Sequence, residues 1–133
     1  MTIDWRKYWW LPGFAVGLLT IGVPYWLVPY HKLNLPDALF GVGLLVVIAA
    51  AALSRLYSGR HFWHVVAVMG SVAPMVVIMR VVVDGLRDST THNLWPFEVV
   101  IAVFVGGVVA LAGTLLGSLG LLLLRRVKPT SRR

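Results

Sequence analysis

The fold is decided most clearly by residues 94–124, which read LWPFEVVIAVFVGGVVALAGTLLGSLGLLLL. Glu98 is the only charged residue in this stretch of the sequence. A hydrocarbon core about 30 Å thick requires about 20 residues of helix, so the segment is long enough to cross a bilayer. Its apolar residues are continuous and do not alternate with polar ones, which excludes the strands of a transmembrane barrel. We therefore predict a membrane-spanning helix.

Three further apolar segments precede it, at residues 8–29, 36–55 and 61–85. Together the four segments account for nearly all of a 133-residue chain that is 59% hydrophobic and only 13% charged. The connections are short, so consecutive helices are expected to lie antiparallel. We predict a polytopic integral membrane protein with one all-α domain over the whole chain. It is an up-down bundle of four transmembrane helices, followed by a basic tail at 125–133.

Three prolines affect where the predicted helices bend or begin. Pro24 and Pro74 lie inside the first and third predicted helices, where each removes a backbone hydrogen bond and clashes with the preceding turn. We expect a kink at both. Pro36 suits the first position of the helix at 36–55, because a helix does not use the N–H group of that residue.

The orientation follows from the Lys and Arg residues near the helix ends. Cytoplasmic connections of membrane proteins carry an excess of these residues. Of twelve Lys and Arg, three (Lys32, Arg80 and Arg87) lie on one side of the predicted bundle. This charge difference predicts a multi-pass protein of the inner, cytoplasmic membrane with both termini in the cytoplasm. The nine on the other side are Arg6, Lys7, Arg55, Arg60, Arg125, Arg126, Lys128, Arg132 and Arg133.

Composition excludes several kinds of chemistry. The net charge of +7 is gathered at helix ends and forms no basic face, so we predict no nucleic-acid partner. The chain has no cysteine, which excludes disulfides, thiolate metal sites and thiol redox reactions. It also lacks the His-x-x-x-His and His-Glu-x-x-His spacings of metal sites on helices. We predict neither a metal nor a cofactor.

Histidines and arginines meet at the cytoplasmic side of the predicted bundle. His61 and His64 share one helix face close to Arg55 and Arg60, where they could contact anionic lipid headgroups. Haem ligation would need histidines that meet from two helices deeper in the membrane, so we do not predict haem. The lipid bilayer is the partner that the composition requires.

A polar cluster is predicted on the opposite, outer side. Arg80 and Asp84 are four residues apart and can pair on one helix face. Arg80 would lie at the edge of the hydrocarbon, where an ionisable residue is a functional candidate. The alternative is that the Arg80 side chain extends to the lipid headgroups while Asp84 neutralises its charge. The full candidate cluster is Arg80, Asp84, Arg87, Asp88, His92, Asn93 and Glu98, which His31 would join if the first hairpin folds over the loop after residue 85.

Two members of this outer cluster have ordinary explanations as well as functional ones. Glu98 lies in the first turn of the last helix, where the helix dipole favours an acid. It could also bind a cation or move a proton. Histidine as a residue type has a near-neutral reference pKa, so His92 could serve as a base, a pH sensor or a ligand. It could equally be a solvated loop residue.

The last helix has a face of small residues that is typical of close helix packing. Gly113 and Gly117 form one small pair on this helix. The face packs either within the chain's own bundle or against a second copy or partner subunit. Beside that pair, a ridge of small residues recurs every four positions: Gly106, Ala110, Thr114 and Ser118.

These features predict a small structural or accessory subunit that acts through helix packing and its outer loop. We assign no catalytic residue and expect no enzymatic activity. The first alternative is an oligomeric transporter or channel for a small solute or ion, and the second is a small membrane enzyme that uses the outer cluster. The first alternative is disfavoured because the predicted mid-membrane polar residues are few: Thr20, Ser71, Thr114 and Ser118.

Overall fold

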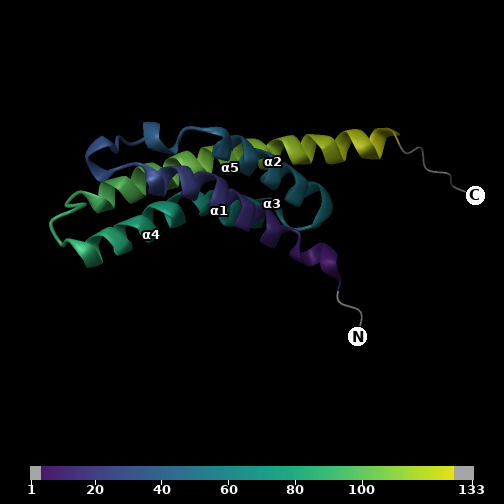
Figure 1. Ribbon diagram of the computed structural model, residues 1–133. Helices are drawn as coiled ribbons and strands as arrows, with labels where there is room; N and C mark the ends of the chain where they lie inside the picture. The colour runs from purple at the N-terminus through teal and green to yellow at the C-terminus, as the bar shows by residue number, and fades with distance from the viewer. Residues whose placement is uncertain (1–3, 128–133) are drawn as a thin grey trace, which may run out of the picture.

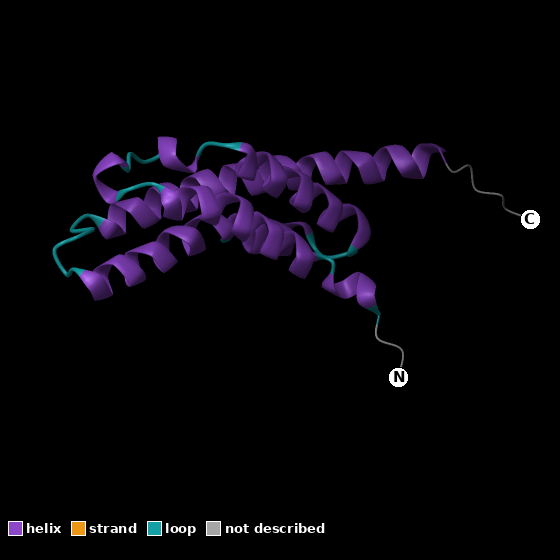
Figure 2. Ribbon diagram, in the orientation of Figure 1, coloured by secondary structure: helices purple, strands orange, loops and turns teal. Residues whose placement is uncertain are grey.

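The computed structural model describes residues 4–127, and all its regular elements are helices (Figures 1 and 2). This confirms the predicted all-α class. The bundle is elongated and consecutive long helices run antiparallel. Its α-helices are α1 (Trp10–Leu27), α2 (Val42–Tyr57), α3 (Phe62–Gly70), α4 (Val72–Arg87) and α5 (Trp95–Val127), with three short 3-10 helices at Trp5–Tyr8 (η1), Tyr30–Lys32 (η2) and Asp37–Leu39 (η3).

Three helical stretches are long and apolar enough to span a membrane. They are α1 with 18 residues, α3 and α4 taken together with 26, and α5 with 33. The fourth, α2, is apolar but has only 16 residues. Large apolar side chains such as Phe104, Leu116 and Leu119 are more than half exposed on the outside of the bundle. Such a surface is suited to lipid.

The second helix begins later than the predicted residue 36. Leu35–Pro36 is a cis peptide bond, and Pro36 precedes η3 instead of opening α2. The side-chain amide of Asn34 donates to Asp37 Oδ2 at 3.0 Å, so the segment closes on itself as a local turn. α2 starts at Val42, where a Cβ atom on Gly43 would lie 2.7 Å from the carbonyl oxygen of Thr20. The close approach to α1 therefore fixes where this helix can begin.

The third predicted helix, 61–85, is divided at Ser71 into α3 and α4. Pro74 has no N–H group to donate to the carbonyl of Gly70, four residues earlier. The helix therefore breaks one turn before the proline. The hydroxyl of Ser71 donates to the carbonyl of Val68 at 2.7 Å. By contrast, Pro24 lies inside α1, which continues to Leu27.

The last helix packs against α2, α3 and α4, and its small residues lie at these contacts. A Cβ atom on Gly106 would lie 2.3 Å from the carbonyl oxygen of Gly70, and one on Gly113 would lie 2.4 Å from that of Ile48. These distances are too short for any side chain. The small-residue face of α5 is thus in contact with the chain's own bundle. Ser118 on this face accepts a hydrogen bond from Arg55 Nε. The buried residues of the face are Gly106, Ala110, Gly113, Thr114 and Gly117.

Substitutions at two adjacent glycines provide a matched test of this packing. Gly106→Ala should lower the free energy of unfolding by about 1–3 kcal/mol, because the added methyl group must displace the backbone of α3. Gly107→Ala should be neutral or stabilising by up to about 1 kcal/mol, since no atom lies within 4 Å of its Cβ position and alanine favours helix. Thermal unfolding in mild detergent measures both. Equal stability of the two variants would contradict the close contact between α3 and α5.

The two ends of the bundle differ in charge. We call the end with connections 28–41 and 88–94 the acidic end, and the end with η1 and connection 58–61 the basic end. The basic end also carries the end of α5, whose Arg125 and Arg126 lie within the helix; residues 128–133 of the predicted tail lie outside the described residues. The acids of the acidic end are Asp37, Asp84, Asp88 and Glu98.

Candidate functional site

His92 is the centre of the acidic end. It is only 2% exposed, although its neighbours on both sides in the loop are more accessible. Its φ of 56° lies in the left-handed region, which turns the ring inward from the loop. Its backbone N–H donates to the hydroxyl oxygen of Tyr30 at 3.0 Å, and the two rings lie 4.6 Å apart. His92 therefore attaches the loop to η2.

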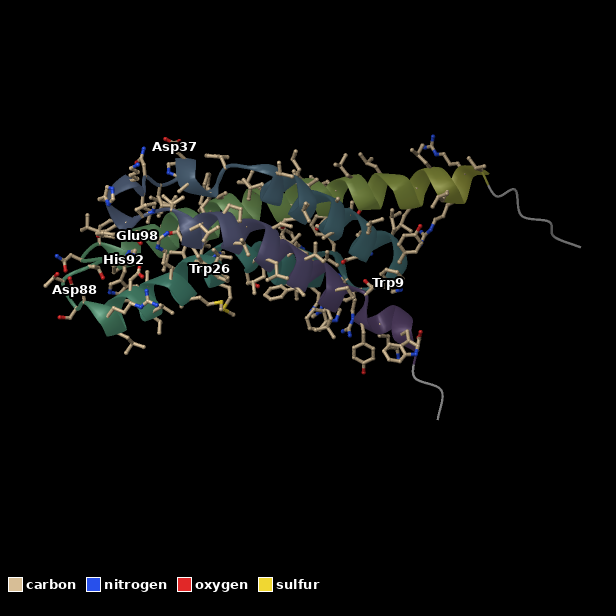
Figure 3. All side chains as sticks on the ribbon, in the orientation of Figure 1. Trp9, Trp26, Asp37, Asp88, His92 and Glu98 are labelled. Carbon is tan, nitrogen blue, oxygen red and sulfur yellow. The ribbon has the colours of Figure 1, made fainter. Side chains whose placement is uncertain are left out.

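Each nitrogen of the His92 ring faces a carboxylate: Nε2 lies 3.0 Å from Oδ2 of Asp84, and Nδ1 lies 2.8 Å from Oε2 of Glu98. Figure 3 shows His92 and Glu98 together at the acidic end. A protonated imidazole can donate to both oxygens. A neutral ring can donate to only one and would turn a nitrogen lone pair toward the other. The geometry therefore places one imidazole ring between two carboxylates from different helices.

Arg80 connects Asp84, His92 and Glu98 to the end of α1. Its Nε donates to Oδ2 of Asp84 at 3.1 Å, which confirms the pair predicted from the spacing. Its two terminal nitrogens donate to the carbonyls of Tyr25 and Val28, and its guanidinium carbon lies 5.1 Å from the centre of the Tyr25 ring. The side chain is 7% exposed and turned into the protein. It does not extend along the lipid surface as the alternative interpretation required.

The sequence explains why α1 needs this arginine. The carbonyls in the last turn of a helix have no partner within that helix. The residue four positions after Tyr25 is Pro29, which has no N–H group to donate to that carbonyl. Arg80 supplies the missing donors from α4. In the sequence, Pro29 just past the end of α1 indicated that a carbonyl of the last turn would lack its N–H donor. It could not indicate that Arg80 would supply the donor.

We call Arg80, Asp84, His92 and Glu98 the acidic-end network. With the imidazole protonated it contains two positive and two negative charges, and so it has no net charge. Buried charges are tolerated when they are paired and hydrogen-bonded in this way. The network connects α4, the 88–94 loop and α5 to each other, and Arg80 connects all of them to α1.

The remaining predicted members lie around the network. Arg87, Asn93 and His31 are exposed, and His31 lines a pocket of about 440 Å³ together with Glu98 and Tyr30. Asp88 accepts hydrogen bonds from the backbone N–H and the hydroxyl of Thr90, at 2.9 and 2.7 Å. These bonds hold the pKa of Asp88 below its ordinary value, because they favour the charged carboxylate. Asp88 therefore stabilises the turn after α4 and is not part of the network.

The network's own contacts limit its chemistry. Among the described residues, no three His, Asp or Glu side chains are grouped so that they could hold a metal ion. A general base needs one free nitrogen directed at its substrate. Both nitrogens of His92 are bonded to carboxylates. What the arrangement can do is hold α1, α4, the 88–94 loop and α5 together.

These features define a class: a helical membrane protein whose apolar bundle is closed at one end by a buried ion-pair network. Neither the family models nor the curated proteins nor the solved structures gave a significant match to this chain.

Proposed function

We propose that the chain is a non-enzymatic, multi-pass membrane protein that serves as a structural or accessory subunit and contacts its partner through the acidic end. The observation that carries this proposal is the closure of the acidic-end network on itself. Its charged groups bond to one another and to backbone carbonyls, and so they stabilise the shape of the end they occupy. A rigid, polar end is suited to contact with another protein.

The mid-bundle hydroxyls support this choice over a transporter or channel. A conducting path needs polar groups that face a shared lumen. Thr20 donates to the carbonyl of Val16, and Thr114 donates to that of Ala110. Ser71 and Ser118 likewise donate to carbonyls of preceding residues. These hydroxyls satisfy the helices that carry them and leave the interior apolar.

For the membrane arrangement we propose four passes, in which α2 crosses despite its length. Its 16 residues span about 24 Å as a helix, and the η3 segment before it could cover the remainder of a hydrocarbon core. The first and last described residues lie at the basic end (Figure 1), as an even number of passes requires. The excess of Lys and Arg places that end in the cytoplasm of a bacterial-type inner membrane.

Single cysteines on this cysteine-free background should report the orientation. Ser89→Cys lies in the exposed loop of the acidic end, and His61→Cys lies at the exposed start of α3. A membrane-impermeant maleimide added to intact cells should label position 89 and leave position 61 unlabelled until the cells are opened. Labelling of position 61 in sealed cells would reverse the proposed topology.

The functional proposal is tested by isolation in mild detergent. We expect one membrane-protein partner at a fixed ratio to this chain. Leu94→Ser with Phe97→Ser should release it, because both side chains are more than 60% exposed at the acidic end. Leu123→Ser, at a similarly exposed site toward the basic end of α5, is the matched control and should retain the partner. A chain that carries no stoichiometric partner, or keeps it in both variants, contradicts the proposal.

A further inference from the structure

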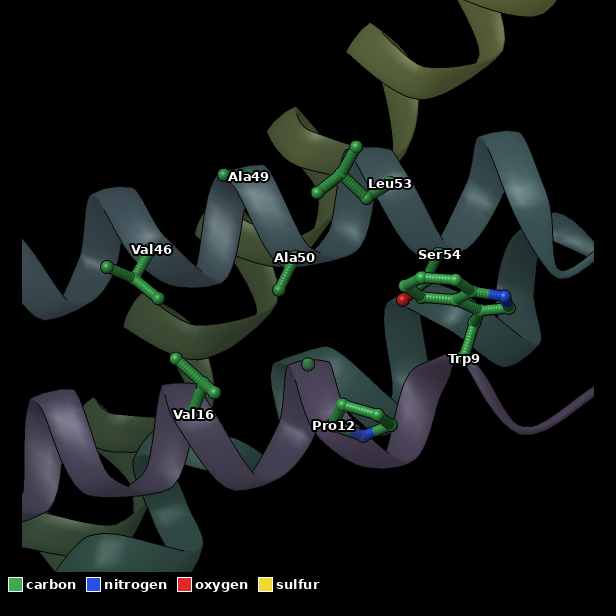
Figure 4. Close-up of a pocket in the computed structure, with 9 residues that line it drawn as sticks. Trp9, Pro12, Val16, Val46, Ala49, Ala50, Leu53 and Ser54 are labelled. Atoms are coloured by element: carbon green, nitrogen blue, oxygen red, sulfur yellow. The ribbon is translucent and has the colours of Figure 1, made fainter. Parts of the chain in front are cut away.

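An apolar groove runs between α1 and α2 near the basic end (Figure 4). Its volume is about 240 Å³. Pro12 and Val16 of α1 face Val46 and Leu53 of α2 across it, and the indole ring of Trp9 lies at the end nearest the termini. Both helices are apolar, and the groove opens on the outside of the bundle, where acyl chains would meet it.

A second apolar recess lies on the other side of Trp9. It has a volume of about 350 Å³ and is lined by Trp5, Tyr8 and Leu11 together with Trp9 and Pro12. Trp9 and Pro12 line both apolar surfaces, so the two are neighbours. Two adjacent apolar surfaces fit a molecule that has two chains.

Positive charge lies next to both surfaces. Nη2 of Arg60 donates to the backbone carbonyl of Lys7 at 3.4 Å, which places the guanidinium beside η1. The Nε atom of Arg60 is buried and has no hydrogen-bond partner within the chain. Buried polar atoms are normally bonded, so an acceptor is missing here. The side chain of Lys7 is exposed at the same place.

We propose that the basic end binds an anionic phospholipid, with its two acyl chains on either side of Trp9 and its phosphate at Arg60 and Lys7. The apolar surfaces fit the chains, and the cations fit the headgroup. This inference is independent of the proposed partner and of which leaflet faces the cytoplasm.

The test uses the purified full chain in mild detergent and native mass spectrometry of bound lipid. Phosphatidylglycerol should be retained in preference to phosphatidylcholine with the same acyl chains. Arg60→Gln should weaken phosphatidylglycerol binding about tenfold, the effect of losing one charge-assisted contact. Arg126→Gln removes the same charge from the far end of α5 and should change binding less than about twofold. Equal retention of the two lipids, or equal effects of the two variants, would overturn the site.

A second pair of variants tests the groove without altering Arg60. Ala49 lines the groove and is exposed, so Ala49→Phe should fill it and reduce phosphatidylglycerol binding. Leu45→Phe, at an exposed residue of α2 that does not line the groove, should not. Glycerol 3-phosphate, which has no acyl chain, should not compete with the lipid. Full competition by it would indicate a simple anion site. Unchanged binding in Ala49→Phe would mean that the groove holds something else, such as a partner helix.

Discussion

Asp84→Ala should lower the free energy of unfolding by about 3–5 kcal/mol, the cost of leaving a buried charge without its partner. The structure makes this loss larger than a single ion pair would suggest. Oδ2 of Asp84 contacts both Arg80 and His92, so its removal leaves a buried arginine without its anion and the His92 ring without one of its two partners. Chemical or thermal unfolding in detergent measures the effect.

The double variant Arg80→Met with Asp84→Ala distinguishes pairing from other roles. It should recover part of the lost stability, because no uncompensated arginine remains. Recovery should be incomplete, since the carbonyls of Tyr25 and Val28 lose their donor. Asp88→Ala, four residues further on and exposed, is the control and should lower stability much less than Asp84→Ala. Small, additive effects of the two single changes would mean that Arg80 and Asp84 do not interact.

His92→Asn should cost about 3 kcal/mol or more, because it removes two hydrogen bonds to charged groups worth about 1.5–3 kcal/mol each. Asparagine is chosen because it tolerates the left-handed backbone found at this position. The effect therefore reports the loss of the ring and not backbone strain. His31→Asn, at an exposed histidine of the same end, should be neutral. Equal stability of the two variants would contradict the role given to His92.

Acid should weaken the turn that follows α4. The pKa of Asp88 is lowered by its two hydrogen bonds from Thr90, so the folded turn favours the charged carboxylate. Its contribution is present above the ordinary pKa of an aspartate and is lost as pH falls through the lowered value. The loop should therefore be held most firmly above the ordinary pKa of an aspartate.

The fold class could be predicted from the sequence because it rests on local properties. A continuous apolar run must become a helix in lipid, since only a helix satisfies its own backbone there. The break before Pro74 and the pair of Arg80 with Asp84 are also local, because both depend on residues four positions apart. The same kind of reasoning was wrong for Pro36, because a proline suits the first position of a helix and a short turn equally well.

The tertiary structure alone decided how the polar residues combine. The sequence grouped His92 and Glu98 in one outer cluster but did not pair them, and only the meeting of α4, α5 and the loop placed one ring between two carboxylates. Tyr30, 62 residues from His92, gave no signal at all. The small residues of α5 indicated close packing but not its partner, which proved to be the chain's own α2 and α3. Such contacts depend on which surfaces meet in space, and helix periodicity carries no information about that.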